Sequence, residues 1–208
     1  MPTSLIRRNR ALIFALVTIL AFITFGYGLL PESLQNPSIA QAKIAEYIGF
    51  APSKLKVDEI YGLIHLVTSG TENYDTLTDA DPAKPVELAV YAGGRRRVDW
   101  RRETKRLDTK YPIVVFSKTY CIYSKRAKKL LASYKIRPAP YIIEVDLRGD
   151  GSTIKALLSR ITGRATFPNI LVHGRSVGGS DELTALHESG ELEKILRRAG
   201  VTVGVLDA

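Results

Sequence analysis

The chain is poor in the residues that build disulfides and metal sites. Cys121 is the only cysteine among 208 residues, which excludes an intramolecular disulfide and any site that needs several cysteines from one chain. The three histidines (His65, His173 and His187) do not share a metal-ligand spacing, which excludes a structural zinc site. Hydrophobic residues make up 45% of the chain and charged residues 25%, which argues against a wholly disordered protein.

Charge is also absent from residues 11–31, which read ALIFALVTILAFITFGYGLLP. At about 1.5 Å per residue, a helix over this segment matches the ~30 Å hydrocarbon core of a bilayer. Three arginines, Arg7, Arg8 and Arg10, stand directly before it. Positive residues stay on the cytosolic side of a membrane, so we expect residues 1–10 to be a cytosolic N-terminus and 11–31 to be a transmembrane signal anchor. The rest of a single-pass type II protein then lies in the lumen.

Two other interpretations of residues 11–31 compete with a retained anchor. A cleaved signal peptide has an apolar core of about 7–15 residues followed directly by a small-x-small site. The best such site, Ala40-Gln41-Ala42, lies nine residues beyond Pro31, which is too far. A buried helix of a soluble domain is the second alternative, but no charged or amide residue marks a solvent-facing side. The pattern therefore favours the anchor.

A small lumenal helical segment is expected over residues 32–70. Apolar residues recur at helical spacing in 40–50 and again in 53–68, with Ser53 as a candidate N-cap and Gly70 as a stop. Two such helices cannot bury a full core, so they must pack on each other, on the main domain or on a second copy. Residues 71–97 are rich in Thr, Asp, Pro and Gly and predict a linker.

A run of basic residues spans the end of this linker and the segment after it (Arg95, Arg96, Arg97, Arg101, Arg102, Lys105 and Arg106). Such a run resembles a nucleic-acid-binding patch. Val98, Trp100 and Leu107 interrupt it at spacings that favour a helix with one solvated face, and a translocated protein does not meet nucleic acid. We therefore expect no nucleic-acid partner.

Residues 98–208 have the pattern of an α/β domain. The expected order is a strand, a helix, a strand, a helix, a hairpin and two closing helices, at 111–116, 122–134, 141–146, 153–161, 169–173 with 176–177, 181–187 and 191–198. This order predicts right-handed crossovers onto one small sheet.

Cys121 lies between the first expected strand of this domain and its first long helix. The amides of a helix start and the positive end of its dipole favour a thiolate there, and Lys118 and Arg126 add positive charge. A lone cysteine is usually a small buried hydrophobe. Polar neighbours (Thr119, Tyr120 and Ser124) favour a reactive thiol instead.

Three ordered blocks resemble the glutaredoxin family. Residues 117–124, SKTYCIYS, resemble the active-site motif in which Cys-Pro-Tyr-Cys or Cys-x-Tyr-Ser is typical. Thr166-Phe167-Pro168 resembles the Thr-Val-Pro turn with its cis proline, and Gly178-Gly179-Ser180-Asp181 resembles the Gly-Gly-x-Asp glutathione loop. The resemblance covers 98–208 and implies a thioredoxin-like (glutaredoxin) α/β fold, a four-stranded mixed sheet flanked by helices, behind the anchor and the helical segment.

The resemblance also implies a site. Cys121 is the expected catalytic residue, Ser124 a modulating one, and the expected glutathione-binding residues are Lys118, Tyr123, Arg164, Thr166, Phe167, Pro168, Gly179, Ser180 and Asp181. Lys118 and Arg164 suit one carboxylate of the tripeptide, and the helix start at Asp181 offers amides to the other. A cis bond before Pro168 would turn the Phe167 backbone toward the ligand.

The motif departs from the dithiol members of the family. Ser124 replaces the second cysteine, Ile122 replaces the proline, and Arg164-Ala165 places the basic group one residue earlier than usual. With its anchor and helical spacer, the chain resembles the monothiol glutaredoxins of the fungal early secretory pathway. That resemblance implies a lumenal location in the endoplasmic reticulum or Golgi.

The implied activity is glutathione-dependent reduction of glutathionylated proteins. An alternative is a homodimer that holds one [2Fe–2S] cluster, with Cys121 of each chain and two glutathione thiolates as ligands. A membrane-tethered interaction domain with an inactive site is a third interpretation.

Overall fold

The computed structural model describes residues 57–69, 77, 80–93 and 97–204, all within the unit Lys56–Ala208. The expected anchor at 11–31 and the helix expected within 40–50 lie outside these residues. Among the helices of the described ranges, none has both the length and the apolar character that a membrane span requires.

One mixed sheet organises the domain. Its strands are β1 (Ile113–Ser117), β2 (Tyr141–Glu144), β3 (Asn169–Val172) and β4 (Arg175–Gly178), in the order β2-β1-β3-β4. The central strand β1 runs parallel to β2 and antiparallel to β3, so that Val115 lies between Ile142 and Ile170. All five residues of β1 are buried, as expected for a short apolar strand with neighbours on both sides. The four-stranded mixed sheet is thus confirmed.

The helices of residues 98–208 agree closely with the prediction. They are α6 (Trp100–Lys110), α7 (Ile122–Ser133), α8 (Gly151–Thr162), α9 (Ser180–Glu188) and α10 (Glu191–Arg198). The second strand is shorter than predicted because the chain turns into a 3₁₀ helix, η3 (Val145–Leu147). Helix α8 ends at Gly163, whose φ of 71° suits a left-handed C-terminal position. The last four residues of the basic run, Arg101, Arg102, Lys105 and Arg106, form the solvated face of α6, whereas Leu107 is buried.

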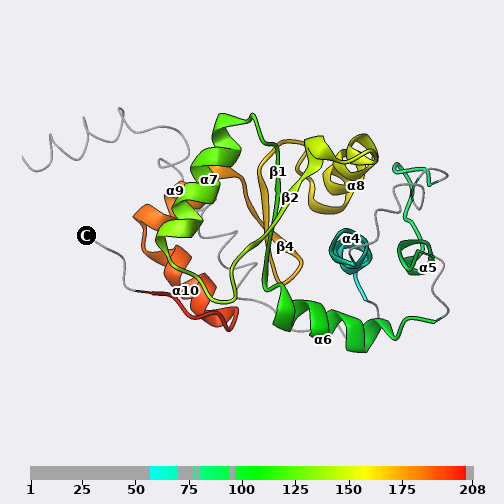
Figure 1. Cartoon of the computed structure of the whole chain (residues 1–208), viewed down its shortest axis with the longest axis horizontal. Helices are drawn as coiled ribbons and strands as arrows, with labels where there is room; N and C mark the ends of the chain where they lie inside the picture. Colours follow the sequence, from blue (N-terminus) through cyan, green and yellow to red (C-terminus); the bar gives the residue numbers. More distant parts are fainter. Residues whose placement is uncertain (1–56, 70–76, 78–79, 94–96, 205–208) are drawn as a thin grey trace, which may run out of the picture. The chain divides into compact units, whose positions relative to one another are not determined.

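Helices cover both faces of the sheet (Figure 1). Helices α7, α9 and α10 lie on one side, and α8 lies on the other together with α4 (Glu59–Thr68). The N-cap of this helix is Asp58, whose backbone is extended with φ −67° and ψ 141°, so the predicted N-cap at Ser53 is wrong. The start at Glu59 places the apolar stripe of α4 in the core, with Leu63 and Ile64 almost wholly buried.

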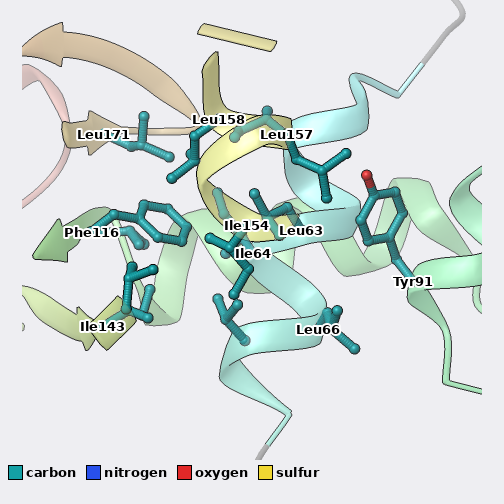
Figure 2. Close-up of a cluster of buried hydrophobic side chains, with 14 of the residues drawn as sticks. Leu63, Ile64, Leu66, Tyr91, Phe116, Ile143, Ile154, Leu157, Leu158 and Leu171 are labelled. Atoms are coloured by element: carbon teal, nitrogen blue, oxygen red, sulfur yellow. The ribbon is translucent and has the colours of Figure 1, made fainter. Parts of the chain in front are cut away.

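Helix α4 packs on the main domain, which is one of the three partners expected for it. Figure 2 shows Leu63 and Ile64 of α4 beside Leu157 of α8, in the same cluster as Phe116 of β1 and Leu171 of β3. The stretch 71–97, expected as a linker, contains the short helix α5 (Leu88–Tyr91), and the Tyr91 ring is fully buried. A Cβ at Gly62 would lie 2.5 Å from Cδ2 of Tyr91, so this close approach needs glycine.

Polar contacts also tie α4 to the domain. Arg160 of α8 donates to both carboxylate oxygens of Glu59, at 2.9 and 2.5 Å, and the Tyr91 hydroxyl donates to Glu59 Oε1 at 2.7 Å. Burial raises the pKa of Glu59, but these bonds outweigh it and hold that pKa below its ordinary value. At the next turn, His65 Nδ1 lies 2.6 Å from Glu103 Oε1 of α6. The helix is therefore part of the domain rather than an appendage to it.

Candidate active site

Cys121 is the N-cap residue of α7, at the end of the loop that leaves β1. Its backbone is extended, with φ −73° and ψ 122°, and its carbonyl accepts a hydrogen bond from the Lys125 amide at 3.0 Å. The side chain is partly buried. Its Sγ lies 3.7 Å from the carbonyl oxygen of Phe167, which comes from the loop before β3. The structure thus brings together two residues that are 46 positions apart in the sequence.

The surroundings of Cys121 favour the thiolate. Burial raises the pKa of the thiol, but hydrogen bonds from the Ser124 amide, the Ser124 hydroxyl and the Tyr123 amide act in the opposite direction. The positive charge of Lys118 adds to them, and the net pKa is below the ordinary value for cysteine. This is the effect expected for a thiol at a helix start.

Ser124 occupies the position of the second cysteine in dithiol glutaredoxins and is fully buried. Its hydroxyl accepts a hydrogen bond from the Lys118 amide at 3.2 Å, and its proton is then directed to the sulfur of Cys121. The side chain therefore links the loop before the cysteine to the helix after it.

Ser124→Ala should raise the pKa of Cys121 toward the ordinary value, because one of the hydrogen bonds to the thiolate is lost while the two amides remain. Because the thiolate fraction falls, losing this one hydrogen bond should lower the rate of iodoacetamide alkylation at neutral pH by about threefold. The pH dependence of alkylation measures this, with Ser133→Ala at the exposed end of α7 as the matched control. An unchanged or lower pKa in the Ser124 variant would contradict this role.

Lys118 lies beside the thiol and the Phe167 ring. Its Nζ is 3.2 Å from the Tyr120 hydroxyl and 5.4 Å from the centroid of the Phe167 ring. A cation over an aromatic face is a favourable arrangement. The structure therefore gathers Lys118, Cys121 and Phe167 at one place, as expected for residues that share a ligand.

Asp146, which the sequence analysis did not single out, holds the loop that carries Lys118. Its carboxylate accepts the Thr119 amide at 2.9 Å and the Thr119 hydroxyl at 2.5 Å. Because β1 and β2 are parallel and Ser117 is level with Glu144, a residue two places beyond β2 is level with Thr119. A carboxylate directly after the second strand was the signal that could have found it.

Arg164, Thr166 and Gly179 lie close together beside Pro168. Arg164 donates from Nη1 to Thr166 Oγ1 at 3.2 Å and forms an ion pair from Nη2 with Glu182. The other oxygen of Glu182 accepts the Gly179 amide at 2.9 Å. A Cβ at Gly179 would lie 2.7 Å from Arg164 Nη1, at the flexible end of that side chain, and 3.1 Å from the Pro168 carbonyl oxygen, so a larger residue would displace the guanidinium. The peptide between Phe167 and Pro168 is cis, as predicted.

Ser180 and Asp181 begin α9, one residue earlier than predicted, and both contact Arg126 of α7. The Ser180 hydroxyl is buried and accepts from Arg126 Nε at 2.7 Å, and Asp181 pairs with Arg126 Nη2. The Arg126 guanidinium also lies 5.6 Å from the centroid of the Tyr123 ring. Arg126 was expected to add charge beside Cys121, but its partner is instead Asp181, across from α7.

The part of the chain that the structure describes contains no group of three or more His, Cys, Asp or Glu side chains placed to hold a metal ion. The site contains one activated thiol, with the Lys118 ammonium, the Phe167 carbonyl and the start of α9 after Gly178 and Gly179 around it.

Comparison with known proteins agrees with this geometry. Residues 113–177 match the family model of glutaredoxin. A glutaredoxin from Ricinus communis is 42% identical over 102 residues, which are 47% of this chain and 94% of that protein. The chain belongs to the glutaredoxin family. This confirms the family resemblance seen in the motifs.

Monothiol members are among the relatives of this glutaredoxin. Monothiol glutaredoxin-S6 from rice is 48% identical over 84 residues, 40% of this chain. The match spans 63% of the rice protein, just under two thirds of its length. A crystal structure of a buckwheat glutaredoxin–glutathione complex has 38% sequence identity and covers 48% of this chain and 88% of that chain, with a TM-score of 0.42.

Proposed function

We propose that this glutaredoxin reduces protein–glutathione mixed disulfides with Cys121 as its only redox-active thiol. The observation that carries the proposal is the state of Cys121: the sole cysteine of the chain caps α7, has a lowered pKa and faces the Phe167 backbone. A thiolate whose pKa is lowered attacks disulfides at neutral pH.

The proposed reaction has two exchange steps. The Cys121 thiolate attacks the glutathione sulfur of the mixed disulfide, the old S–S bond breaks, and the substrate leaves as a thiolate that takes a proton from water. The thiolate of a second glutathione then attacks the glutathione sulfur bound to Cys121. Glutathione disulfide leaves and the Cys121 thiolate is restored. Ser124 cannot form a disulfide, so the second thiol must come from solution.

Glutathione binds, in this proposal, along the surface formed by the predicted residues, namely Lys118, Tyr123, Arg164, Thr166, Phe167, Pro168, Gly179, Ser180 and Asp181. Lys118 and Arg164 supply positive charge to carboxylates, and the start of α9 supplies amides. The Phe167 carbonyl, 3.7 Å from Sγ, is placed to pair with the backbone of a tripeptide whose sulfur reaches Cys121.

A [2Fe–2S] cluster is a second candidate, favoured by the exposure of Ile122, which is 70% exposed directly beside Cys121. Such a cluster needs four thiolates. One chain supplies one thiolate, so two Cys121 side chains and two glutathiones would hold it in a homodimer. Proline at position 122 would stiffen the loop and remove an amide, whereas isoleucine leaves an apolar side chain free to face a second copy.

A single preparation tests both candidates. The full chain is purified in detergent under anaerobic conditions with iron, sulfide and glutathione, and the release of thiol from a glutathionylated substrate and the visible spectrum are recorded together. Turnover supports the reductase, and an inactive protein contradicts it. Colour that is lost on gel filtration without glutathione, and reduced by Ile122→Pro, supports the cluster. A colourless monomer would refute the cluster.

We also propose that this glutaredoxin is a single-pass type II protein of the endoplasmic reticulum or Golgi, of the type found in the fungal early secretory pathway. The support is the uncharged segment 11–31 behind Arg7, Arg8 and Arg10. In sealed microsomes, added protease should leave 32–208 intact, and it should digest that part after detergent opens the vesicles. Digestion without detergent would refute the topology.

A further inference from the structure

The outer face of the first two turns of α7 combines exposed apolar side chains with free positive charge. Tyr120, Ile122 and Tyr123 surround Cys121 and are 66, 70 and 49% exposed. Single exposed apolar side chains are ordinary on a protein surface, but here three of them gather at the nucleophile. Glutathione, a tripeptide, needs only part of this surface. The rest can contact the substrate protein to which the glutathione is attached.

The basic residues of α7 divide into two sets. Arg126 is paired with Asp181, and Lys128 with Glu144 at 2.5 Å. Lys125 and Lys129 are exposed and, within the residues that the structure describes, face no carboxylate. The nearby Asp146 carboxylate is occupied by Thr119. The acidic groups at this end of the domain are thus bound internally, and two lysines keep uncompensated charge.

The free lysines lie in one row that starts at the thiol. Cys121, Lys125 and Lys129 are spaced by four residues, so they share one side of the helix, and the lysines are about 6 and 12 Å along the axis from Cys121. An extended chain advances about 3.3 Å per residue, with alternate side chains on the same side. Carboxylates two and four residues from a cysteine therefore match this row.

From this match we infer that Lys125 and Lys129 select substrate proteins whose glutathionylated cysteine lies in an extended segment with acidic residues two and four positions away. The inference rests on the proposed reductase function and names its substrate class. The partner that contacts these lysines is the protein half of the mixed disulfide, because its carboxylates would neutralise their unpaired positive charge. Ile122 and Tyr123 contact apolar side chains next to the cysteine. The two lysines do not touch the reacting sulfurs, so they are specificity residues.

The test compares three glutathionylated peptides of equal length with capped ends. One carries Glu two and four residues before the cysteine, one carries Glu at the same distances after it, and one carries Gln at all four positions. With the full chain at low salt, one acidic peptide should exceed the Gln peptide about fivefold in kcat/KM, the effect of two exposed ion pairs. At about 0.5 M salt the preference should disappear.

A Lys125→Gln/Lys129→Gln variant should lose this preference. The matched control is Lys105→Gln/Lys155→Gln, which removes the same charge from exposed positions of α6 and α8 and should keep it. The unchanged protein and both variants should reduce the mixed disulfide of glutathione and 2-mercaptoethanol at equal rates. If the unchanged protein did not reduce it at all, the proposed function would be refuted instead. Equal rates for the three peptides, or a preference that survives in the Lys125/Lys129 variant, would overturn the inference.

Discussion

Replacing Cys121 with serine is expected to abolish reductase activity, with a loss of about a thousandfold or more. A serine hydroxyl is not ionised at neutral pH and cannot form a disulfide, and no other thiol in the chain can take over the attack. The fold should be unchanged, because the residue is partly exposed and serine is a favoured N-cap.

Turnover of a glutathionylated substrate, with circular dichroism as a check of folding, measures this loss. Ser124→Ala is the matched comparison, because it changes the same hydrogen-bonded group but leaves the nucleophile, and it should lower activity only severalfold. A folded Cys121→Ser protein that still turned over would overturn the proposed mechanism.

Leu63→Ala is expected to lower the free energy of unfolding by about 2–5 kcal/mol, the range for a fully buried leucine that leaves a cavity. Leu63 of α4 is completely buried, in the same cluster as side chains of α8 and the sheet. Urea unfolding of the full chain in detergent, followed by the fluorescence of Trp100, measures the change. Leu147→Ala, at a side chain that is 71% exposed, should change it by less than about 0.5 kcal/mol.

A small effect of Leu63→Ala, equal to that of Leu147→Ala, would show that α4 does not contribute to the core. The same variant also separates stability from chemistry. Cys121 comes from a different helix, on the other side of the sheet, so the folded Leu63 variant should keep its thiol reactivity.

Local patterns were enough to predict the position of Cys121. A short apolar run predicted β1, a helical period predicted α7, and the thiol had to lie between them. The resemblance of residues 166–168 and 178–181 to two short glutaredoxin blocks implied the cis peptide before Pro168 and the start of α9 near Asp181. Such features depend on neighbours in the sequence, so the sequence carries them directly.

Contacts between distant segments were not predictable in this way. The pairs Arg126–Asp181 and Arg164–Glu182 join residues that are 55 and 18 positions apart, and many other carboxylates were equally plausible partners. The same holds for α4. Its apolar stripe predicts that one face of the helix is buried, but it does not predict which element that face packs against. Its place beside α8 depends on the shape that α8 and the sheet leave open, which a one-dimensional pattern does not encode.

Under the proposed function, Glu182 competes with glutathione for the Arg164 guanidinium, because the two side chains already form an ion pair. A glutathione carboxylate that approaches Arg164 must displace or share a guanidinium that Glu182 already holds, while Glu182 keeps its bond to the Gly179 amide. The ligand thus gains only the difference between two similar interactions. An interaction that is weak in both the ground state and the transition state lowers the affinity for glutathione but does not raise the barrier of the chemical step. In the proposed cycle, which releases glutathione disulfide at every turnover, an arginine already paired within the protein favours fast release of the product over tight binding.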